Sequence, residues 1–401
     1  MTDSARPLRV ALDVSALRLG NAGVARATRG LAAALEARSD IDLILLGDGP
    51  APAAGSVSRR ALALHVDLAW HPRGARRAAA AQQAAILHTP LARGPLTPGG
   101  PPTVVTIHDL AAIRHAHTLS RWNRLYTSQT LPRVLATATA IVAVSQDTAD
   151  DIAAYAPEAA ARVTVIPNGV GADWSEPPVG PGPIAGPFVL AVGTPEPRKN
   201  LRRLVNAMAK RRSAGAPERL VLVGADGWGD EPLPHAPWLI RLGRVSDRDL
   251  RLLYRDAVAV AIPSLHEGSG LPVLEAFASG TPVVAARAGA LPETCGAAAV
   301  LVDPFNIRDI AGGIDEAIAR HDELVPAGRE LAAAATWERA AEAYVDVYRT
   351  LAAATGDAAP AATAADDLST PDDPTASAAG AGLEMAPDPV ADPPAPSDDG
   401  V

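Results

Sequence analysis

Apolar positions along the chain fall into two kinds of segment that alternate. Short runs rich in β-branched residues are followed by longer Ala- and Leu-rich stretches, in which apolar positions repeat with the period of a helix. This alternation is typical of βα units and predicts parallel sheets covered by helices. We expect strands at 8–14, 41–46, 85–89, 103–107, 140–144, 163–166, 188–192, 220–223, 239–242, 258–262, 282–285 and 299–301. We expect helices at 23–38, 119–138, 147–155, 201–212, 271–279, 307–320 and, as one long segment, 326–353.

The alternation is interrupted by a segment that neither helix nor sheet can continue. Residues 177–187 contain five prolines and three glycines, a composition typical of a linker. We therefore predict two doubly wound α/β domains, at 1–178 and 187–335. Ligands of such sheets bind beyond the carboxyl ends of the strands, so loops of both domains are expected to line one cleft.

Composition excludes several classes of protein. A single cysteine among 401 residues excludes a disulfide framework and a Cys-rich zinc site. No apolar run approaches the roughly 20 residues that a membrane-spanning helix needs. The first ten residues lack the apolar region of a signal peptide, so we expect a cytoplasmic protein.

The formal net charge of −9 belongs to one end of the chain. Ten acidic residues and no Lys or Arg lie between 356 and 401, so residues 1–355 carry a charge of +1. The segment 355–401 consists mainly of Ala, Pro and Asp and has few large apolar residues. Such a segment buries too little surface to offset its ordering entropy, and we predict a disordered acidic tail.

The strongest local signal is the segment 263–276, which reads Pro-Ser-Leu-His-Glu-Gly-Ser-Gly-Leu-Pro-Val-Leu-Glu-Ala. A strand ends there, a Gly-rich turn follows, and a helix is predicted from 271, so backbone N–H groups suit a phosphate or diphosphate. Glu267 and Glu275 stand eight positions apart and are expected to reach different parts of an elongated ligand. Carboxylates accept hydrogen bonds from paired sugar hydroxyls. An ordinary strand–turn–helix with a capping glutamate fits the same pattern.

A second signal lies between a predicted strand and helix at 192–200, which reads Val-Gly-Thr-Pro-Glu-Pro-Arg-Lys-Asn. The chain has only two lysines, and Lys199 stands beside Arg198. Two cations at a helix start oppose the local dipole unless an anion binds there. A diphosphate would resolve the conflict, with arginine as a bidentate fork and lysine as a point charge; a solvated pair is the alternative.

Two weaker signals lie in the first domain. Residues 20–26, Gly-Asn-Ala-Gly-Val-Ala-Arg, join the first strand to its helix and are similar to a phosphate-binding turn, without forming a G-x-G-x-x-G fingerprint. His108 and Asp109 follow the strand 103–107. The histidine either meets a sugar hydroxyl, holds a proton or has a purely structural role.

Taken together, these segments resemble the family 4 nucleotide-sugar glycosyltransferases of the GT-B fold, over roughly residues 8–350. Glu267 and Glu275 match the family's E-x7-E signature, 192–201 its VGxxxPRKN loop, and 166–170 its PNGV turn. The resemblance implies an N-terminal acceptor-side domain and a C-terminal donor domain, both Rossmann-like. It also implies a C-terminal helix, at 336–354, that packs back on the first domain.

The resemblance also implies roles for individual residues in a retaining reaction that needs no metal or other cofactor. Arg198 and Lys199 would bind the donor diphosphate and stabilise the departing nucleotide. Glu267 would contact hydroxyls of the donor sugar, Glu275 the ribose, and His108 would face the transferred sugar. Further donor contacts would come from Gly23, Gly193, Val245, Gly268, Ser269, Gly270 and Leu271.

The form of the PRKN loop and His108 resemble most the mannosyltransferase branch, which implies GDP-mannose as donor and a glycan or lipid-linked acceptor. A UDP-sugar-dependent glucosyl- or GlcNAc-type transferase and a non-catalytic nucleotide-sugar-binding subunit are the alternatives. Ten arginines against two acids lie between Arg59 and Arg133. Such a patch suits peripheral contact with the anionic inner face of the plasma membrane, or is scattered arginine on a solvated surface. No nucleic-acid partner is expected.

Overall fold

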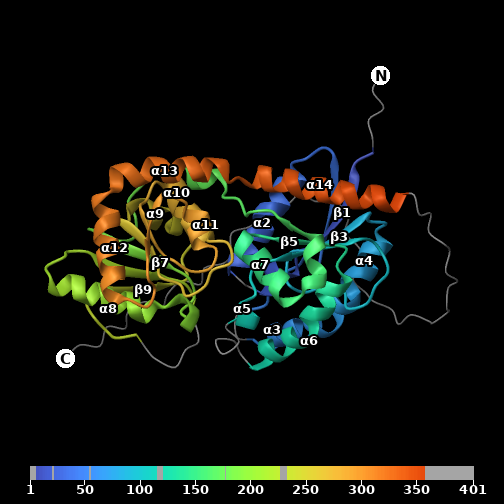
Figure 1. Ribbon diagram of the computed structural model, residues 1–401, viewed down its shortest axis with the longest axis horizontal. Coiled ribbons are helices and arrows are strands. Elements are labelled where there is room, and N and C mark those ends of the chain that lie inside the picture. The colour runs from blue at the N-terminus through green and yellow to red at the C-terminus, as the bar shows by residue number, and fades with distance from the viewer. Residues whose placement is uncertain are drawn as a thin grey trace, which may run out of the picture.

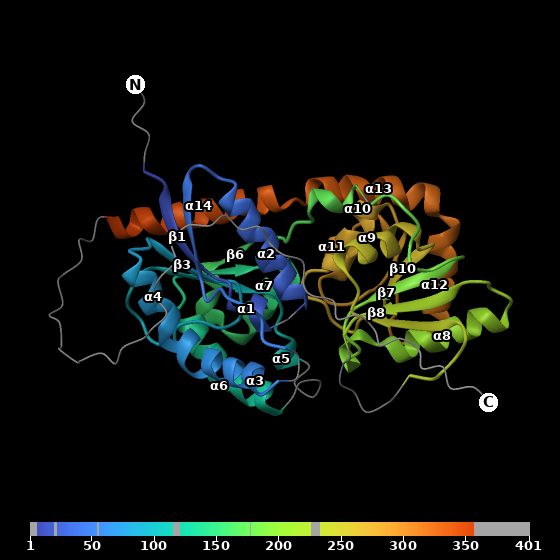
Figure 2. The ribbon, with the colours of Figure 1, turned by 180° about the vertical axis from the view of Figure 1, so that it is seen from behind.

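The computed structural model describes residues 6–19, 22–53, 56–114, 121–176, 178–225 and 233–356. It has two lobes, each built on a six-stranded parallel sheet (Figure 1, and from behind in Figure 2). The sheets have the strand orders β2-β1-β3-β4-β5-β6 and β12-β11-β10-β7-β8-β9. The predicted α/β class with two doubly wound sheets is therefore confirmed.

The predicted strands are all present, with ends that differ by at most about two residues from the expected ones. This agreement arises because each is a short, mainly apolar run inside a sheet with helices on both faces. The inner strands are mostly buried, whereas the edge strands β2, β6 and β9 are mostly half-buried. The first sheet consists of β1 (Leu8–Asp13), β2 (Ile41–Leu46), β3 (Ile86–Thr89), β4 (Thr103–Ile107), β5 (Ala140–Ala143) and β6 (Val163–Val165). The second consists of β7 (Phe188–Val192), β8 (Arg219–Val223), β9 (Leu239–Gly243), β10 (Ala259–Ile262), β11 (Val283–Ala286) and β12 (Ala299–Val302).

Helices of the first lobe cover both faces of its sheet. They are α1 (Ser15–Leu19), α2 (Ala22–Glu36), α3 (Val57–His65), the π-helical segment η1 (Val66–Gly74), α4 (Ala75–Ala81), α5 (Ala111–Arg114), α6 (Arg121–Thr137) and α7 (Gln146–Tyr155), followed by the 3-10 turns η3 (Pro157–Arg162) and η4 (Ala172–Trp174). The helix α2 packs on one face with alternate strand residues such as Val10 and Val104, whereas α6 and α7 pack on the other with Val105 and Ile141.

The second lobe is built in the same way. Its helical segments are η5 (Pro197–Lys199), α8 (Leu201–Ser213), α9 (Asp247–Asp256), α10 (Leu271–Ser279), α11 (Leu291–Cys295), α12 (Ile307–Ala319) and α13 (His321–Ala334). The helices α9 and α10 share a core with one face of the sheet, and α8 and α12 share a core with the other. None of the described helices has the length and hydropathy that crossing a membrane requires.

The prediction of one long helix at 326–353 is wrong. Two helices meet here, α13 and α14 (Trp337–Gly356), and between them the chain crosses from the second lobe to the first. At the crossing, Val170 N donates to the carbonyl of Ala335 (2.8 Å), and Val170 pairs with Thr336 in a parallel bridge. The hydrophobic pattern does not reveal the break, because no glycine or proline marks it and both helices share the same Ala-rich apolar pattern; the helix start at 336 was implied by the family resemblance alone.

The helix α14 packs on the first lobe, beside α2 and the sheet, through a buried polar network. The hydroxyl of Tyr348 hydrogen-bonds His88 Nδ1 (2.7 Å), His88 Nε2 bonds Thr106 Oγ1 (2.8 Å), and that hydroxyl bonds Tyr344 OH (2.9 Å). Burial lowers the pKa of His88 to about 3, so its ring is neutral. The helix α14 is thus held on the first lobe by specific hydrogen bonds as well as by apolar packing.

Two further expectations differ from the structure or lie outside it. The segment 57–81 is helical although no helix was expected there, and α9 was also missed, because its many charged residues hide a narrow apolar face. The predicted tail lies outside the described residues from 357 onward. The domain bounds at 178 and 187 stay predictions; Val170 and Trp174 already pack with the core of the second lobe.

Candidate active site

The two strongest sequence signals lie side by side, because of the strand order of the second sheet. Its order is that of a dinucleotide-binding fold, and it reverses between β7 and β10, which are paired neighbours. Ligands of doubly wound sheets bind at this switch point, beyond the carboxyl ends of the strands. The PRKN loop follows β7 and the loop containing Glu267 follows β10.

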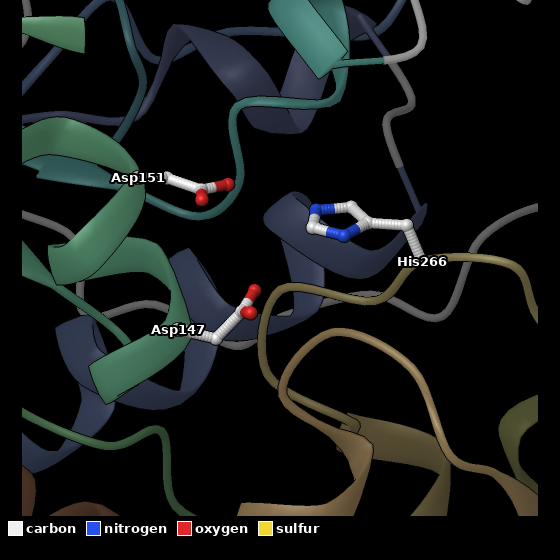
Figure 3. Close-up of side chains that lie close together, drawn as sticks. All are labelled: Asp147, Asp151 and His266. Atoms are coloured by element: carbon white, nitrogen blue, oxygen red, sulfur yellow. The ribbon is translucent and has the colours of Figure 1, made fainter. Parts of the chain in front are cut away.

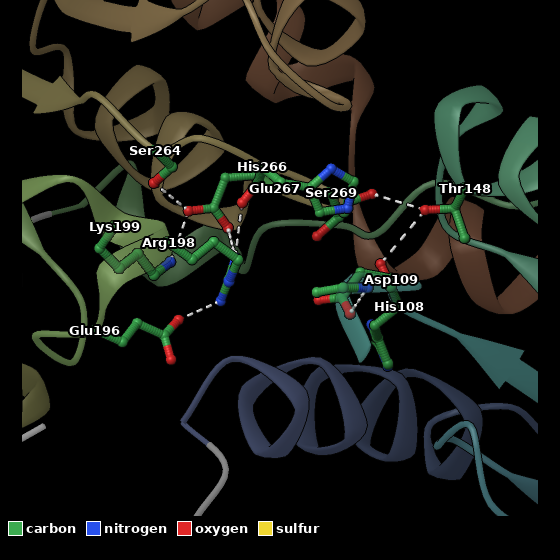
Figure 4. A network of polar contacts seen from close by, with 12 residues as sticks. His108, Asp109, Thr148, Glu196, Arg198, Lys199, Ser264, His266, Glu267 and Ser269 are labelled. Atoms are coloured by element: carbon green, nitrogen blue, oxygen red, sulfur yellow. Dashed lines mark hydrogen bonds and ion pairs between the residues drawn. The ribbon is translucent and has the colours of Figure 1, made fainter. Parts of the chain in front are cut away.

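Arg198, Lys199 and Glu267 form one ion-pair cluster at this point (Figure 4). Lys199 Nζ donates to Glu267 Oε1 (2.6 Å), and Arg198 Nη1 donates to Glu267 Oε2 (3.2 Å). Arg198 also donates to the carbonyl of His266 (2.8 Å) and to Glu196 Oε1 (2.6 Å). The structure therefore brings together three of the four predicted catalytic residues.

The charge state of Glu267 follows from this cluster. Burial by itself raises the pKa of the carboxyl, but the Lys199 ammonium and Arg198 guanidinium outweigh burial, and the pKa falls to about 2. Ser264 Oγ adds a hydrogen bond to Oε1 (2.6 Å). Glu267 is thus an anion near neutral pH, able to accept hydrogen bonds but unable to donate a proton.

Asn200 is a site residue whose role the sequence analysis missed. It stands in the left-handed region (φ 56°), and its buried amide donates to the carbonyls of Pro263 (2.9 Å) and Pro304 (2.7 Å). One side chain therefore ties the loops after β7, β10 and β12 together. The signal was present, since asparagine is the residue that best tolerates this backbone conformation other than glycine.

The Gly-rich turn connects the cluster to the first lobe. Gly270 precedes α10 in the left-handed conformation, and no side chain of the described residues caps this helix. Gly268 lies against the carbonyl of His108, so close that a Cβ there would overlap it. The two lobes are therefore in direct contact at the predicted donor turn.

His108 completes the set of predicted catalytic residues from the other lobe. One of its ring nitrogens bonds the carbonyl of Pro90, and burial lowers its pKa, which favours the neutral ring. Its Nε2 is shielded from solvent and has no hydrogen-bond partner among the described residues. A neutral nitrogen with an open lone pair is suited to accept a hydrogen bond from a ligand hydroxyl.

Glu275, the second signature carboxylate, lies apart from this cluster and is only 1% exposed. Its Oε1 accepts a hydrogen bond from Arg26 of α2, and its Oε2 accepts one from Tyr254 OH (2.9 Å). Burial raises the pKa of Glu275, and Arg26 and Tyr254 offset only part of that effect. Sequence reasoning missed both partners.

The remaining predicted donor contacts are distributed over both lobes. Gly193 follows β7 with φ 145°, and a Cβ there would lie 3.2 Å from Lys199 Cε. Val245 is half-buried after β9 and packs against the core that contains α9. Gly23 is exposed in the first turn of α2, and a Cβ added there would meet no other side chain or loop of the described residues within 4 Å. The sequence predicts a loop between the first strand and this helix. Residues 15–19 of that segment form α1, and residues 20 and 21 lie outside the described part of the chain.

Further contacts across the lobes surround the turn. Asn168 of the PNGV segment donates to Ser269 Oγ (3.0 Å), and Thr148 Oγ1 lies 3.5 Å from the carbonyl oxygens of His108 and Gly268. Glu293 accepts hydrogen bonds from the backbone N–H of Gln146 (3.0 and 2.9 Å) at the first turn of α7. An acidic side chain at a helix N-terminus is electrostatically favourable.

A mixed cluster of side chains bridges the lobes on the side of α7 (Figure 3). Asp147, Asp151 and His266 each place a potential ligand atom within 4.8 Å of the others, which among the described residues is the one such group. Burial raises the pKa of Asp151, and an ion pair with Arg114 opposes that effect. The cluster therefore already holds a cation from the protein.

Two doubly wound domains that meet at the carboxyl edges of their sheets, with the last helix crossing back, define the GT-B class of glycosyltransferase folds. Sucrose-phosphate synthase from Thermosynechococcus elongatus has this fold, with a TM-score of 0.61, 19% identity, and coverage of 86% of this chain and 100% of that chain. HepE from Anabaena, in complex with UDP and glucose, has a TM-score of 0.56, 17% identity, and coverage of 86% and 100%.

Sequence comparison gives the family. Residues 21–174 match the model of Glycosyltransferase Family 4, and residues 186–320 match that of Glycosyl transferases group 1. The O-antigen chain mannosyltransferase B of Escherichia coli is 34% identical over 177 residues, 41% of this chain and 46% of that protein. The MMP alpha-(1->4)-mannosyltransferase of Mycolicibacterium hassiacum is 29% identical over 279 residues, 62% and 65%. The matches thus span about half to two thirds of these relatives. The chain belongs to the family 4 glycosyltransferases.

Proposed function

We propose that the protein is a retaining glycosyltransferase that moves a hexose, best mannose from GDP-mannose, to a glycan or lipid-linked acceptor. The observation that carries the proposal is the cluster of Arg198, Lys199 and Glu267 at the switch point of the second sheet, adjacent to His108 of the other domain. The two cations suit the diphosphate of a nucleotide sugar. The ionised carboxylate of Glu267 and the neutral ring nitrogen of His108 suit its hydroxyl groups.

In the proposed reaction, Arg198 and Lys199 hold the donor diphosphate and stabilise the charge that develops as the nucleotide departs. Glu267 accepts hydrogen bonds from donor-sugar hydroxyls, and it is too acidic to serve as a proton donor. The backbone N–H groups of the turn at 268–271 contact sugar and phosphate. The acceptor attacks on the face that the leaving group vacates, and the leaving phosphate takes its proton.

The reaction is proposed to need no metal. Arg198 and Lys199 supply the positive charge at the proposed diphosphate site. In the cluster of Asp147, Asp151 and His266, Arg114 supplies the positive charge through its ion pair with Asp151. Turnover should therefore be the same within twofold after dialysis against EDTA. Loss of turnover that Mg²⁺ or Mn²⁺ restores would contradict this part of the proposal.

The identity of the donor is tested by a panel of nucleotide sugars, read first by thermal shift and then by turnover. The similarity to two proteins named mannosyltransferases favours GDP-mannose. UDP-glucose and UDP-GlcNAc represent the alternative, since HepE was solved with UDP and glucose. Binding of a donor without hydrolysis or transfer would favour a non-catalytic subunit, and absence of binding to every donor would refute the proposal.

Peripheral contact with an anionic membrane, on the cytoplasmic side, is the second part of the proposal. The helices α3 and α6 lie side by side in both views, and they expose Arg60, Leu64, Arg124 and Leu125. Apolar side chains between arginines fit a surface that inserts shallowly among acidic headgroups. Co-sedimentation with anionic vesicles should exceed that with neutral vesicles and fall in the R60E/R124E double variant. Arg212→Glu, at an exposed arginine of the other domain, is the control.

A further inference from the structure

Arg26, from the first domain, forms an ion pair with the buried carboxylate of Glu275. Arg26 Nη1 donates to Oε1 of this carboxylate and Tyr254 OH donates to Oε2 (2.9 Å), so each oxygen is already engaged. The arginine and the glutamate stand 249 positions apart, on α2 of one domain and α10 of the other. With a side chain only 1% exposed, Glu275 has no open face for another hydrogen-bond donor.

A second acceptor for the arginine lies close by. Arg26 Nη2 is 4.0 Å from Asp247 Oδ1, and the Asp247 side chain is 82% exposed. The guanidinium also lies over the ring of Trp174, 5.5 Å from its centroid. A small rotation would therefore move the charge from the buried carboxylate to the exposed one, while the stem stays on the aromatic ring.

The proposed role of Glu275 conflicts with this arrangement. A carboxylate that holds a ribose must accept hydrogen bonds from hydroxyl groups at its oxygens. A ribose diol can satisfy the buried carboxylate only if it takes the position of the guanidinium. Because removing one partner of a buried ion pair is costly, the hydroxyl groups must replace the arginine as it leaves.

We propose that Arg26 occupies the ribose subsite on Glu275 in the ligand-free enzyme, and that the nucleotide displaces it toward Asp247. This inference rests on the proposed function, since it takes Glu275 as the ribose ligand. Arg26 is then a positioning residue that links nucleotide binding to the contact between domains. Part of the ribose binding energy is used to release that contact.

The test is the contribution of the ribose hydroxyls to affinity. Isothermal calorimetry first measures GDP and UDP with the wild-type protein, and the tighter ligand is then compared with its 2′,3′-dideoxy form. The quantity of interest is the ratio of the two Kd values, dideoxy over ribose form. Loss of the Arg26 charge changes attraction to the diphosphate equally in both ligands, so that effect cancels in the ratio.

In Arg26→Ala the ratio should rise at least fivefold over the wild type, because the hydroxyls no longer compete with a guanidinium. Arg26→Gln should change it in the same direction and keeps part of the stem that packs on Trp174. In Arg29→Ala, three residues further along α2, the ratio should stay within twofold. A ratio in both Arg26 variants that equals or falls below the wild-type value would overturn the inference. Failure of the wild type to bind either nucleotide would refute the proposed function instead.

Discussion

A single methyl group at Gly268 should separate the two domains without damaging either of them. A Cβ at this position would overlap the carbonyl oxygen of His108 and would lie 2.9 Å from Asp109 Cβ. Non-bonded carbon atoms rest at about 3.5–4.0 Å, and the overlap with the carbonyl oxygen is deeper, so the domains would have to move apart by at least about 1 Å. Gly268 does not have a positive φ, so alanine fits its backbone without strain.

The expected consequence is a defect in turnover. Misplacement of reacting groups by about 1 Å costs on the order of 10²-fold in rate, so kcat of Gly268→Ala should fall by about that factor. Arg198, Lys199 and Glu267 lie within one domain, and affinity for the nucleoside diphosphate should therefore be unchanged or higher. The midpoint of thermal unfolding should change by only a few degrees.

The assay is steady-state transfer or donor hydrolysis, with nucleotide affinity and thermal unfolding measured on the same preparation. Gly312→Ala is the matched control, because a Cβ there meets no other atom of the described residues within 4 Å. Wild-type kcat in Gly268→Ala would show that contact between the turn and His108 is not needed for catalysis.

Three other substitutions test separate parts of the account. Lys199→Ala should lower kcat at least 100-fold with the fold intact by circular dichroism, whereas Lys210→Ala, at the other lysine, should be neutral. Since the pKa of Glu267 is lowered to about 2, its ion pairs stabilise the fold above the ordinary pKa of 4.5 and lose that contribution as pH falls through 2. The difference in free energy of unfolding between the wild type and Glu267→Gln, measured in urea, should therefore decrease by about 2 kcal/mol from pH 7 to pH 3. A difference that does not change with pH would contradict the pairing. Tyr348→Phe leaves buried His88 Nδ1 without its partner and should cost about 1–3 kcal/mol in urea unfolding; Tyr155→Phe, at a half-buried tyrosine, is the control.

Local pattern was enough to predict the strands and the charged residues that lie at the switch point of the second sheet. The strands are short, mainly apolar runs bounded by polar or Gly/Pro residues, which the local pattern reveals. Arg198, Lys199 and Glu267 follow strands that are neighbours in any sheet of this order. The contact between Arg26 and Glu275 was not predictable, and the crossing at Ala335 was expected from the family resemblance but not from the hydrophobic pattern. Both depend on how the two domains meet, and residues 249 positions apart leave no trace of their contact in local periodicity.

The PNGV turn makes contacts between the domains that its sequence does not reveal. Gly169 lies against the backbone of Thr336 and Trp337, so closely that a Cβ there would overlap the crossing chain. The neighbouring Asn168 donates to Ser269 of the Gly-rich turn, and Val170 bonds Ala335. Three consecutive residues therefore contact the crossing and the Gly-rich turn at once. Gly268, which lies between the two glutamates of the E-x7-E signature, also contacts the other domain. These motif residues hold the two domains against each other beside the charged cluster of Arg198, Lys199 and Glu267.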